Sequence, residues 1–213
     1  MTPLQSKLLT RIAVQGPLTV AEYMADCLLH PEHGYYATRD PLGAAGDFTT
    51  APEISQMFGE LVGLTLAQSW MDQGAPSAFI LAEAGPGRGT LMADILRATR
   101  AVPGFHAAAQ VHLIEASPVL RQIQRDTLDK IDLGKIELVW HHGFDALPEM
   151  PLWFVANEFF DALPVRQFIR DGAQWRERCV AATKDELHFA LSAAARLPDL
   201  DHRLTDTKDG DLV

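Results

Sequence analysis

The sequence predicts a doubly wound α/β protein with a parallel sheet, preceded by a helical N-terminal segment. From about residue 77 onward, short apolar runs alternate with segments of helical periodicity. The apolar runs are continuous rather than alternating, which is typical of parallel strands buried on both faces. A glycine-rich stretch follows the first run directly, as at a strand-to-helix turn that makes room for a ligand.

Composition excludes several classes of protein. The chain has 213 residues, 47% of them hydrophobic, and a net charge of −10 at pH 7. That charge argues against nucleic acid or an anionic membrane as the main partner, and no apolar stretch reaches the length of a membrane span. Cys27 and Cys179 form no metal-ligand pattern and fit a reducing compartment. We expect the bacterial cytoplasm; the alternative is the mitochondrial matrix, because Lys7 and Arg11 on an amphipathic start resemble a transit peptide.

Helices are expected in the N-terminal segment, residues 1–76. Apolar residues 4, 8 and 12 predict a first helix that ends at Gly16-Pro17. "TVAE" (19–22) is a capping box that opens a second helix. After a long loop-like stretch, "TAPE" (50–53) is predicted to be another capping box, opening a helix that closes near Gly74. Five side chains of that helix are expected to face inward: Ile54, Met57, Phe58, Leu61 and Val62.

The second region, residues 77–213, is predicted to carry the parallel sheet. Its four strands are "FILA", "VHLIEA", "KIELVW" and "LWFVANE". A helix follows the glycines, and Ser117 with Pro118 begins another one, with Leu120, Ile123 and Leu128 inward. Asp171-Gly172 is predicted to turn a hairpin. From about Ala195 the chain is polar and acidic, without a strand signal.

The glycine-rich stretch reads "EAGPGRG", with Glu83 followed by Gly85, Gly87 and Gly89. A P-loop would need a lysine after the last glycine, and none follows. The dinucleotide fingerprint would need its third glycine at Thr90, so that fit is poor. An ordinary strand-to-helix turn is the other alternative. The remaining pattern, acid-x-Gly-x-Gly-x-Gly at a strand end, is that of class I S-adenosylmethionine (SAM) methyltransferases.

The chemistry of SAM accounts for this pattern. SAM carries no phosphate, so the loop needs close backbone approach and a helix N-terminus rather than a lysine. A second acid at the end of the next strand should bind the ribose hydroxyls, and Glu115 stands there. A third acid after the third strand commonly faces the adenine amine; Asp145 is the candidate. The cofactor expected from these residues is SAM.

Three stretches together resemble one family: residues 34–63, 83–97 and 156–168. They are similar to the MidA-like proteins, the family of the mitochondrial protein arginine methyltransferase of complex I assembly, from about Thr10 to about Cys179. The resemblance implies a class I fold, SAM as methyl donor and a protein acceptor. It implies an arginine of a complex I subunit, or of its bacterial counterpart, as the methylated residue.

The resemblance also implies roles for particular residues. Glu83 and the three glycines would form the donor loop, with Glu115 as the ribose acid. An N-terminal motif would cover cofactor or substrate, and it comprises Gly46, Asp47, Phe48, Thr50, Pro52 and Glu53. Asn157, Glu158 and Asp161 occupy the position where methyltransferases contact the acceptor. Carboxylates bind a guanidinium bidentately, and Glu158 and Asp161 would face the same way on a helical turn. Phe159 and Phe160 are expected to line core and pocket.

Two other functions stay open from the sequence: a SAM-binding assembly scaffold without catalysis, and a dinucleotide-dependent oxidoreductase. A class I methyltransferase sheet has seven strands in the order 3-2-1-4-5-7-6, and only the first four are recognisable here. The fourth, "LWFVA", would then have an unpaired edge that invites association. The sequence therefore predicts a chain truncated after the fourth strand, with a compromised acceptor site and low or no transfer activity alone.

Overall fold

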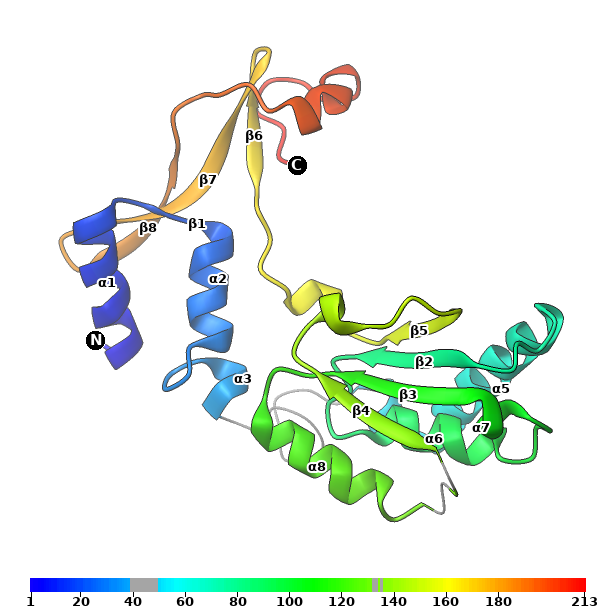
Figure 1. Ribbon diagram of the computed structural model, residues 1–213. Helices are drawn as coiled ribbons and strands as arrows, with labels where there is room; N and C mark the ends of the chain where they lie inside the picture. The colour runs from blue at the N-terminus through cyan, green and yellow to red at the C-terminus, as the bar shows by residue number, and fades with distance from the viewer. Residues whose placement is uncertain (39–49, 132–133, 135) are drawn as a thin grey trace. The chain divides into compact units, whose positions relative to one another are not determined.

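The structure is a computed structural model that describes residues 1–38, 50–131, 134 and 136–213. The chain forms two compact units (Figure 1). Unit 1 comprises Met1–Arg39 and Leu163–Val213, and unit 2 comprises Asp40–Ala162. Each unit has a sheet of its own. The boundary between residues 76 and 77 that the sequence suggests lies within unit 2.

Unit 1 contains an antiparallel sheet, in which β7 pairs with β1, β6 and β8. Its elements are α1 (Pro3–Gln15), β1 (Leu18–Thr19), α2 (Val20–Leu29), α3 (Tyr35–Thr38), β6 (Phe168–Asp171), β7 (Gln174–Thr183), β8 (Glu186–Leu191) and the 3-10 helix η3 (Pro198–Thr205). The first capping box is confirmed, because the Thr19 side chain accepts from the Glu22 backbone and the Glu22 carboxylate accepts from the Thr19 backbone. The hairpin at Asp171-Gly172 is confirmed as well, between β6 and β7.

A small apolar core holds unit 1 together. Leu8 and Ile12 of α1 pack against Leu18 of β1 and Val180 of β7. The predicted inner face of the first helix is therefore confirmed. The same cluster joins the two sequence segments that make up unit 1, because β1 pairs with β7 through Leu18 and Val180.

Unit 2 contains a parallel sheet with the strand order β4-β3-β2-β5. Its elements are α4 (Ala51–Ile54), α5 (Gln56–Asp72), β2 (Phe79–Ala84), α6 (Thr90–Thr99), α7 (Phe105–Ala108), β3 (Ala109–Ile114), α8 (Pro118–Leu128), β4 (Glu137–His141), the 3-10 helix η1 (Phe144–Ala146), β5 (Leu152–Ala156) and the 3-10 helix η2 (Phe160–Ala162). All four predicted strands are confirmed. If these four strands are numbered 1 to 4 along the chain, their order in the sheet is 3-2-1-4. This order places β2 and the glycine loop that follows it in the middle of the sheet.

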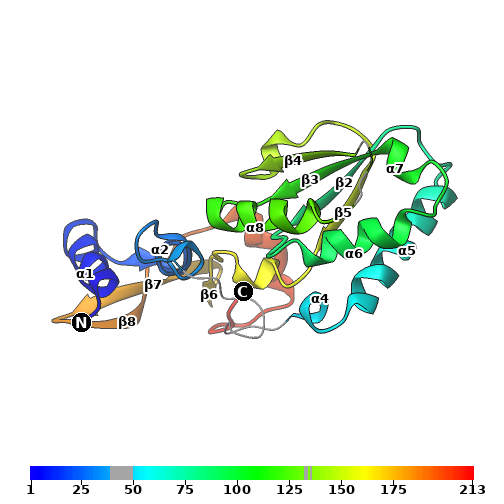
Figure 2. The ribbon, with the colours of Figure 1, turned by 90° about the horizontal axis from the view of Figure 1, so that it is seen from below.

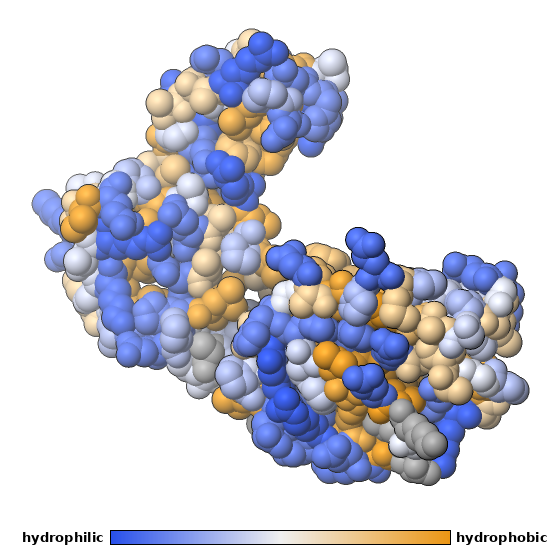
Figure 3. Space-filling model, in the orientation of Figure 1, coloured by the Kyte–Doolittle hydropathy of each residue, from blue (hydrophilic) through white to orange (hydrophobic). Residues whose placement is uncertain are grey.

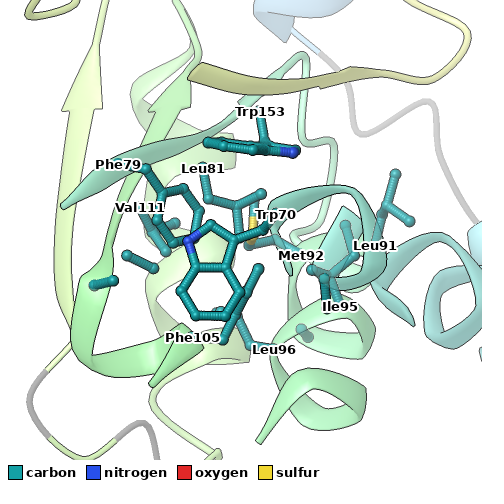
Figure 4. Packing of buried hydrophobic residues seen from close by; sticks show 14 of the residues in the cluster. Trp70, Phe79, Leu81, Leu91, Met92, Ile95, Leu96, Phe105, Val111 and Trp153 are labelled. Carbon is teal, nitrogen blue, oxygen red and sulfur yellow. The ribbon is translucent and has the colours of Figure 1, made fainter. Parts of the chain in front are cut away.

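Helices α5, α6 and α8 lie side by side along one face of this sheet (Figure 2). An aromatic cluster fills the layer between them and the strands (Figure 4). The ring of Phe79 lies 5.0 Å from Phe105 and 5.0 Å from Trp153, measured between centroids, and Trp70 lies 5.4 Å from Phe105. Aromatic pairs at these distances stabilise a core beyond the area that they bury.

The predicted inner face of α5 is wrong in part. Ile54, Met57 and Leu61 are exposed, although Phe58 and Val62 do pack against the core. The residues of α5 that are buried form a different stripe: Gly59, Gly63, Ala67 and Trp70. Small residues face α6 because the two helices approach closely, and a large side chain would not fit between them. Some of the apolar side chains of α5, including Met57, Leu61 and Leu64, therefore point outward. Apolar surface is also visible on the face of unit 2 shown in Figure 3.

The second predicted capping box is also wrong. Thr50 precedes α4, but its side chain makes no capping hydrogen bond within the described part of the chain. α4 ends after one turn, and α5 begins anew at Gln56. The Glu53 carboxylate instead accepts a hydrogen bond of 2.6 Å from the hydroxyl of Thr90, the first residue of α6.

Candidate functional site

The glycine loop connects β2 to α6 at the carboxyl edge of the sheet. Gly85, Gly87 and Gly89 have φ angles of +61°, +56° and +83°. These left-handed conformations explain why glycine occupies all three positions, since other L-residues adopt them at a cost. The Gly89 backbone N–H donates to the Pro86 carbonyl at 2.8 Å and closes the turn, and α6 begins at the next residue. The loop thus presents bare backbone and a helix N-terminus, as predicted.

Glu83 lies beneath this loop at the end of β2. Its side chain is buried, and burial raises the pKa of its carboxyl to about 8, against a smaller opposing effect of a hydrogen bond from the Met92 backbone. One carboxyl oxygen, Oε2, has no hydrogen-bond partner among the described residues. A buried polar atom without a partner is costly, so a donor from a ligand would be favourable here.

Glu115 follows β3 and is the most strongly oriented acid of the site. Its Oε1 accepts from the Ser117 backbone N–H at 2.8 Å, and its Oε2 accepts from the Gln124 side chain at 3.3 Å. The Arg121 guanidinium holds the Glu115 main-chain carbonyl. Burial raises the pKa of this carboxyl, and the bonds from Ser117 and Gln124 lower it. Each oxygen keeps acceptor capacity for a further donor, which suits a pair of ribose hydroxyls.

The remaining predicted cofactor residues are placed differently. Asp145 lies in η1, directly after β4, with its side chain exposed at the same edge of the sheet. Gly46 and Asp47, together with Phe48, lie outside the described residues. Of the same N-terminal motif, Pro52 is buried, and Glu53 contacts α6 one residue after the glycine loop.

The three predicted acceptor residues follow β5. Asn157 is half-buried, and the side chains of Glu158 and Asp161 are exposed. Glu158 has a φ of +49°, the left-handed region, and η2 begins only at Phe160. The expectation that Glu158 and Asp161 share a helical turn is therefore wrong. A non-glycine residue in this conformation is strained, and such strain clusters at functional sites.

Phe159 connects the segment that carries the predicted acceptor residues, 157–161, to the glycine loop. A Cβ atom at residue 85 would lie 2.4 Å from the Phe159 ring, so the ring packs directly on Gly85. Phe144, Phe154 and Phe160 continue the aromatic cluster, with centroid distances of 5.5 to 6.2 Å between neighbouring rings. The close contact holds Phe159 against the loop, and the rings of Phe144 and Phe160 remain exposed.

Gln124 contacts two of the predicted cofactor residues, and the sequence did not reveal it. It is fully buried on α8 and bonds to Gly87, Glu115 and Trp140. Ile123 was expected on the inner face, but Gln124 takes that place between Leu120 and Leu128. Gln124 lies four residues from both Leu120 and Leu128, and this helical spacing indicates that it shares their buried face. The polarity of glutamine concealed this signal.

The residues present fit SAM. The loop carries three glycines and no lysine, Glu115 has capacity for a diol, and buried Glu83 has an oxygen without a partner in the described structure. These features stand at the carboxyl edge of a parallel sheet of order 3-2-1-4, at the middle strand. Together they define the class I SAM-dependent methyltransferases.

Comparison with known proteins agrees with this class. Residues 61–210 match the family model described as "Putative S-adenosyl-L-methionine-dependent methyltransferase". The chain belongs to this family, so the predicted recognition and fold class are confirmed, and SAM is the cofactor of the family. Membership disfavours the dinucleotide-dependent oxidoreductase.

Curated relatives are named protein arginine methyltransferase NDUFAF7, mitochondrial. The human protein is 38% identical over 98% of this chain and 52% of its own length, and the mouse protein is 40% identical over 92% of this chain and 50% of its own. The chain thus spans about half the length of the curated relatives it matches. A COG1565 superfamily structure from Burkholderia thailandensis, bound to S-adenosyl-homocysteine, is 30% identical with a TM-score of 0.78, covering 98% of this chain and 55% of that one.

No helix in the described ranges is both long and apolar enough to cross a bilayer.

Proposed function

We propose that this protein transfers a methyl group from SAM to an arginine side chain of a protein, a complex I subunit or its bacterial counterpart. The names of the curated relatives support arginine as the methylated residue. Those relatives are named as mitochondrial, which supports the matrix alternative; a bacterial acceptor would place the chain in the cytoplasm. When bound, SAM supplies a methyl group on a sulfonium.

The observation that carries the proposal is the contact between acceptor segment and donor loop. Phe159 packs on Gly85, and this places the exposed carboxylates of Glu158 and Asp161 on the short segment that touches the cofactor loop. Carboxylates accept the N–H groups of a guanidinium in a planar arrangement that an ammonium cannot match. The exposed rings of Phe144 and Phe160 add faces on which a guanidinium stacks well.

The two acids have separable tasks in this proposal. One carboxylate orients the guanidinium by accepting two N–H groups, which contributes mainly by fixing the attacking nitrogen in place. The other accepts the proton that the nitrogen loses once it carries the methyl group. Asn157 directly precedes Glu158 and is half-buried, and its amide supplies N–H donors to the same segment.

The test uses tritiated SAM with purified complex I from the source organism, followed by amino-acid analysis. We expect label in methylated arginine, although weak because the sequence predicts low transfer activity for this chain alone, and loss of that label in Glu158→Gln and Asp161→Asn. Glu149→Gln is the matched control, since Glu149 is an exposed acid in the preceding connection. Label on lysine, or label that survives both substitutions, would contradict the assignment. SAM binding without any label would favour the scaffold alternative.

A further inference from the structure

Gln124 is the most deeply buried polar residue beside the cofactor loop. Its side chain is completely inaccessible to solvent, on the face of α8 that also carries Leu120 and Leu128. An amide in such a place must have its hydrogen bonds satisfied or it destabilises the fold. Its partners are therefore informative about why it is there.

Three partners fix the orientation of the amide. The indole N–H of Trp140 on β4 donates to Oε1 of Gln124 at 2.9 Å. An indole is a donor only, so Oε1 must face Trp140 and Nε2 must face the other side. There Nε2 donates to the Gly87 carbonyl at 2.9 Å and to Glu115 Oε2 at 3.3 Å. Both amide hydrogens are thus used, and both are directed at predicted cofactor residues.

The backbone of α8 also supports the loop. A Cβ atom at Gly89 would lie 3.3 Å from the Gln124 Cα. Gln124 therefore touches the loop at two of its three glycines, once through its side chain and once through its backbone. The loop cannot move relative to α8 without breaking one of these contacts.

The same amide orients the ribose acid. Gln124 holds Oε2 of Glu115 while the Ser117 backbone holds Oε1, so the plane of the carboxylate is set from both sides. The two donors also counteract the effect of burial on the pKa of this carboxyl and favour its ionised, acceptor form. Gln124 thus connects the glycine loop to Glu115, the predicted ribose acid.

We propose that Gln124 is a positioning residue for the cofactor, joining the glycine loop to the carboxylate that receives the vicinal diol of a nucleoside. It acts through Glu115 and Gly87. The inference rests on the cofactor site alone and is independent of the acceptor proposed above.

The test is calorimetric titration with S-adenosylhomocysteine and with its 2′-deoxy analogue. The variants are Gln124→Met, which keeps the volume, Glu115→Gln, and the double variant. We expect Gln124→Met to weaken S-adenosylhomocysteine binding roughly tenfold and to reduce the discrimination against the deoxy analogue to about twofold or less. The double variant should bind no more weakly than Glu115→Gln, because the two residues act as a unit.

Gln122→Met is the matched control on the same helix. Gln122 is exposed and bonds only to Asp126, at 2.8 Å, among the contacts described, so its variant should bind both ligands as the parent does. A Gln124→Met variant that keeps the parent's discrimination, or whose effect simply adds to that of Glu115→Gln, would overturn the positioning role of Gln124. It would leave the predicted cofactor site unaffected. A parent protein that binds neither ligand would overturn the cofactor site as well.

A pH profile provides a second test if Gln124→Met does not fold. Gln124→Glu places a second carboxyl group against Glu115. Two such groups cannot both ionise easily, and they share a proton at low pH. We expect the affinity of Gln124→Glu for S-adenosylhomocysteine to fall as pH rises from 5 to 8, relative to Gln122→Glu. Parallel profiles of the two variants would contradict the inference.

Discussion

Two acids of the site, Glu83 and Glu115, have different surroundings. Glu115 is half-buried and has donors on both carboxyl oxygens. Glu83 is buried with one oxygen unpartnered in the described structure, and its pKa is raised to about 8. Similar positions at strand ends therefore give one carboxyl group with donors on both of its oxygens and one carboxyl that is largely protonated at neutral pH.

The buried carboxyl of Glu83 makes stability depend on pH. Its pKa is about 8 in the folded protein and near the ordinary 4.5 in the unfolded chain. Between these values the folded state holds the additional proton, so this group's contribution to the unfolding free energy falls as pH rises, by at most about 1.4 kcal/mol per unit. Relative to the parent, Glu83→Gln should become progressively more stable from pH 5 to 8 and level off above. Urea unfolding without cofactor measures this, and a constant difference would contradict the expectation.

We expect SAM binding to depend on the backbone of the glycine loop and on Glu115, the predicted diol acceptor. Gly87→Val should abolish measurable binding, because a β-branched residue at a φ of +56° is strained and its side chain would fill space the ligand needs. Glu115→Ala should weaken binding by on the order of 1–3 kcal/mol. Titration calorimetry with SAM tests both, with Glu149→Ala as the control. Parental affinity in both variants would place the site elsewhere.

At the scale of elements, the contact between α5 and α6 decides which face of α5 is buried. A Cβ atom at Gly63 would lie 2.9 Å from the Ile95 Cα and 3.0 Å from the Ile95 carbonyl oxygen. Both are backbone atoms, which cannot move aside as a flexible side chain would. The helices therefore approach over glycine, and Met57, Leu61 and Leu64 of α5 occupy the outer face.

Gly63→Ala should consequently destabilise the protein, although alanine is the better helix former. The helix-propensity gain is roughly 0.5–1 kcal/mol, and overpacking against a backbone costs about 1–3 kcal/mol. Thermal or urea unfolding gives the sign directly. Thr65→Ala, exposed on the same helix, should change the unfolding free energy by less than about 0.5 kcal/mol. A stabilised Gly63→Ala would show that the helices are less tightly packed than described.

At the scale of the whole molecule, local patterns predicted the parallel strands and the glycine loop, because each combines an apolar run with residues of special conformation. The packing face of α5 was missed because Gly59 and Gly63 carry no hydropathy signal. Gln124 was missed because a polar residue is normally taken as exposed. The pairing of β1 with β7 in unit 1 could not be predicted for another reason: Leu18 pairs with Val180, and nothing local indicates a partner so far along the chain.

The outer face of α5 has a consequence for the chain as a whole. Met57, Leu61 and Leu64 are 65%, 58% and 49% exposed, and their spacing places them on one stripe. Leu61 and Leu64 also line a shallow hollow together with Gln68. Apolar surface of this kind favours association, since its burial is worth about 25 cal/mol per Å². Residues 1–213 should therefore self-associate as concentration rises.

Light scattering and size exclusion over a range of concentrations test this expectation. The double variant Leu61→Glu with Leu64→Glu should associate on the order of tenfold more weakly. Its melting temperature should stay close to the parent's, because both side chains are already exposed. The control is Thr65→Glu with Gln68→Glu, which adds the same charge to the same hollow but removes no large apolar group. If the parent stays monomeric at every concentration, or if the control dissociates it equally well, the apolar stripe is not what drives association.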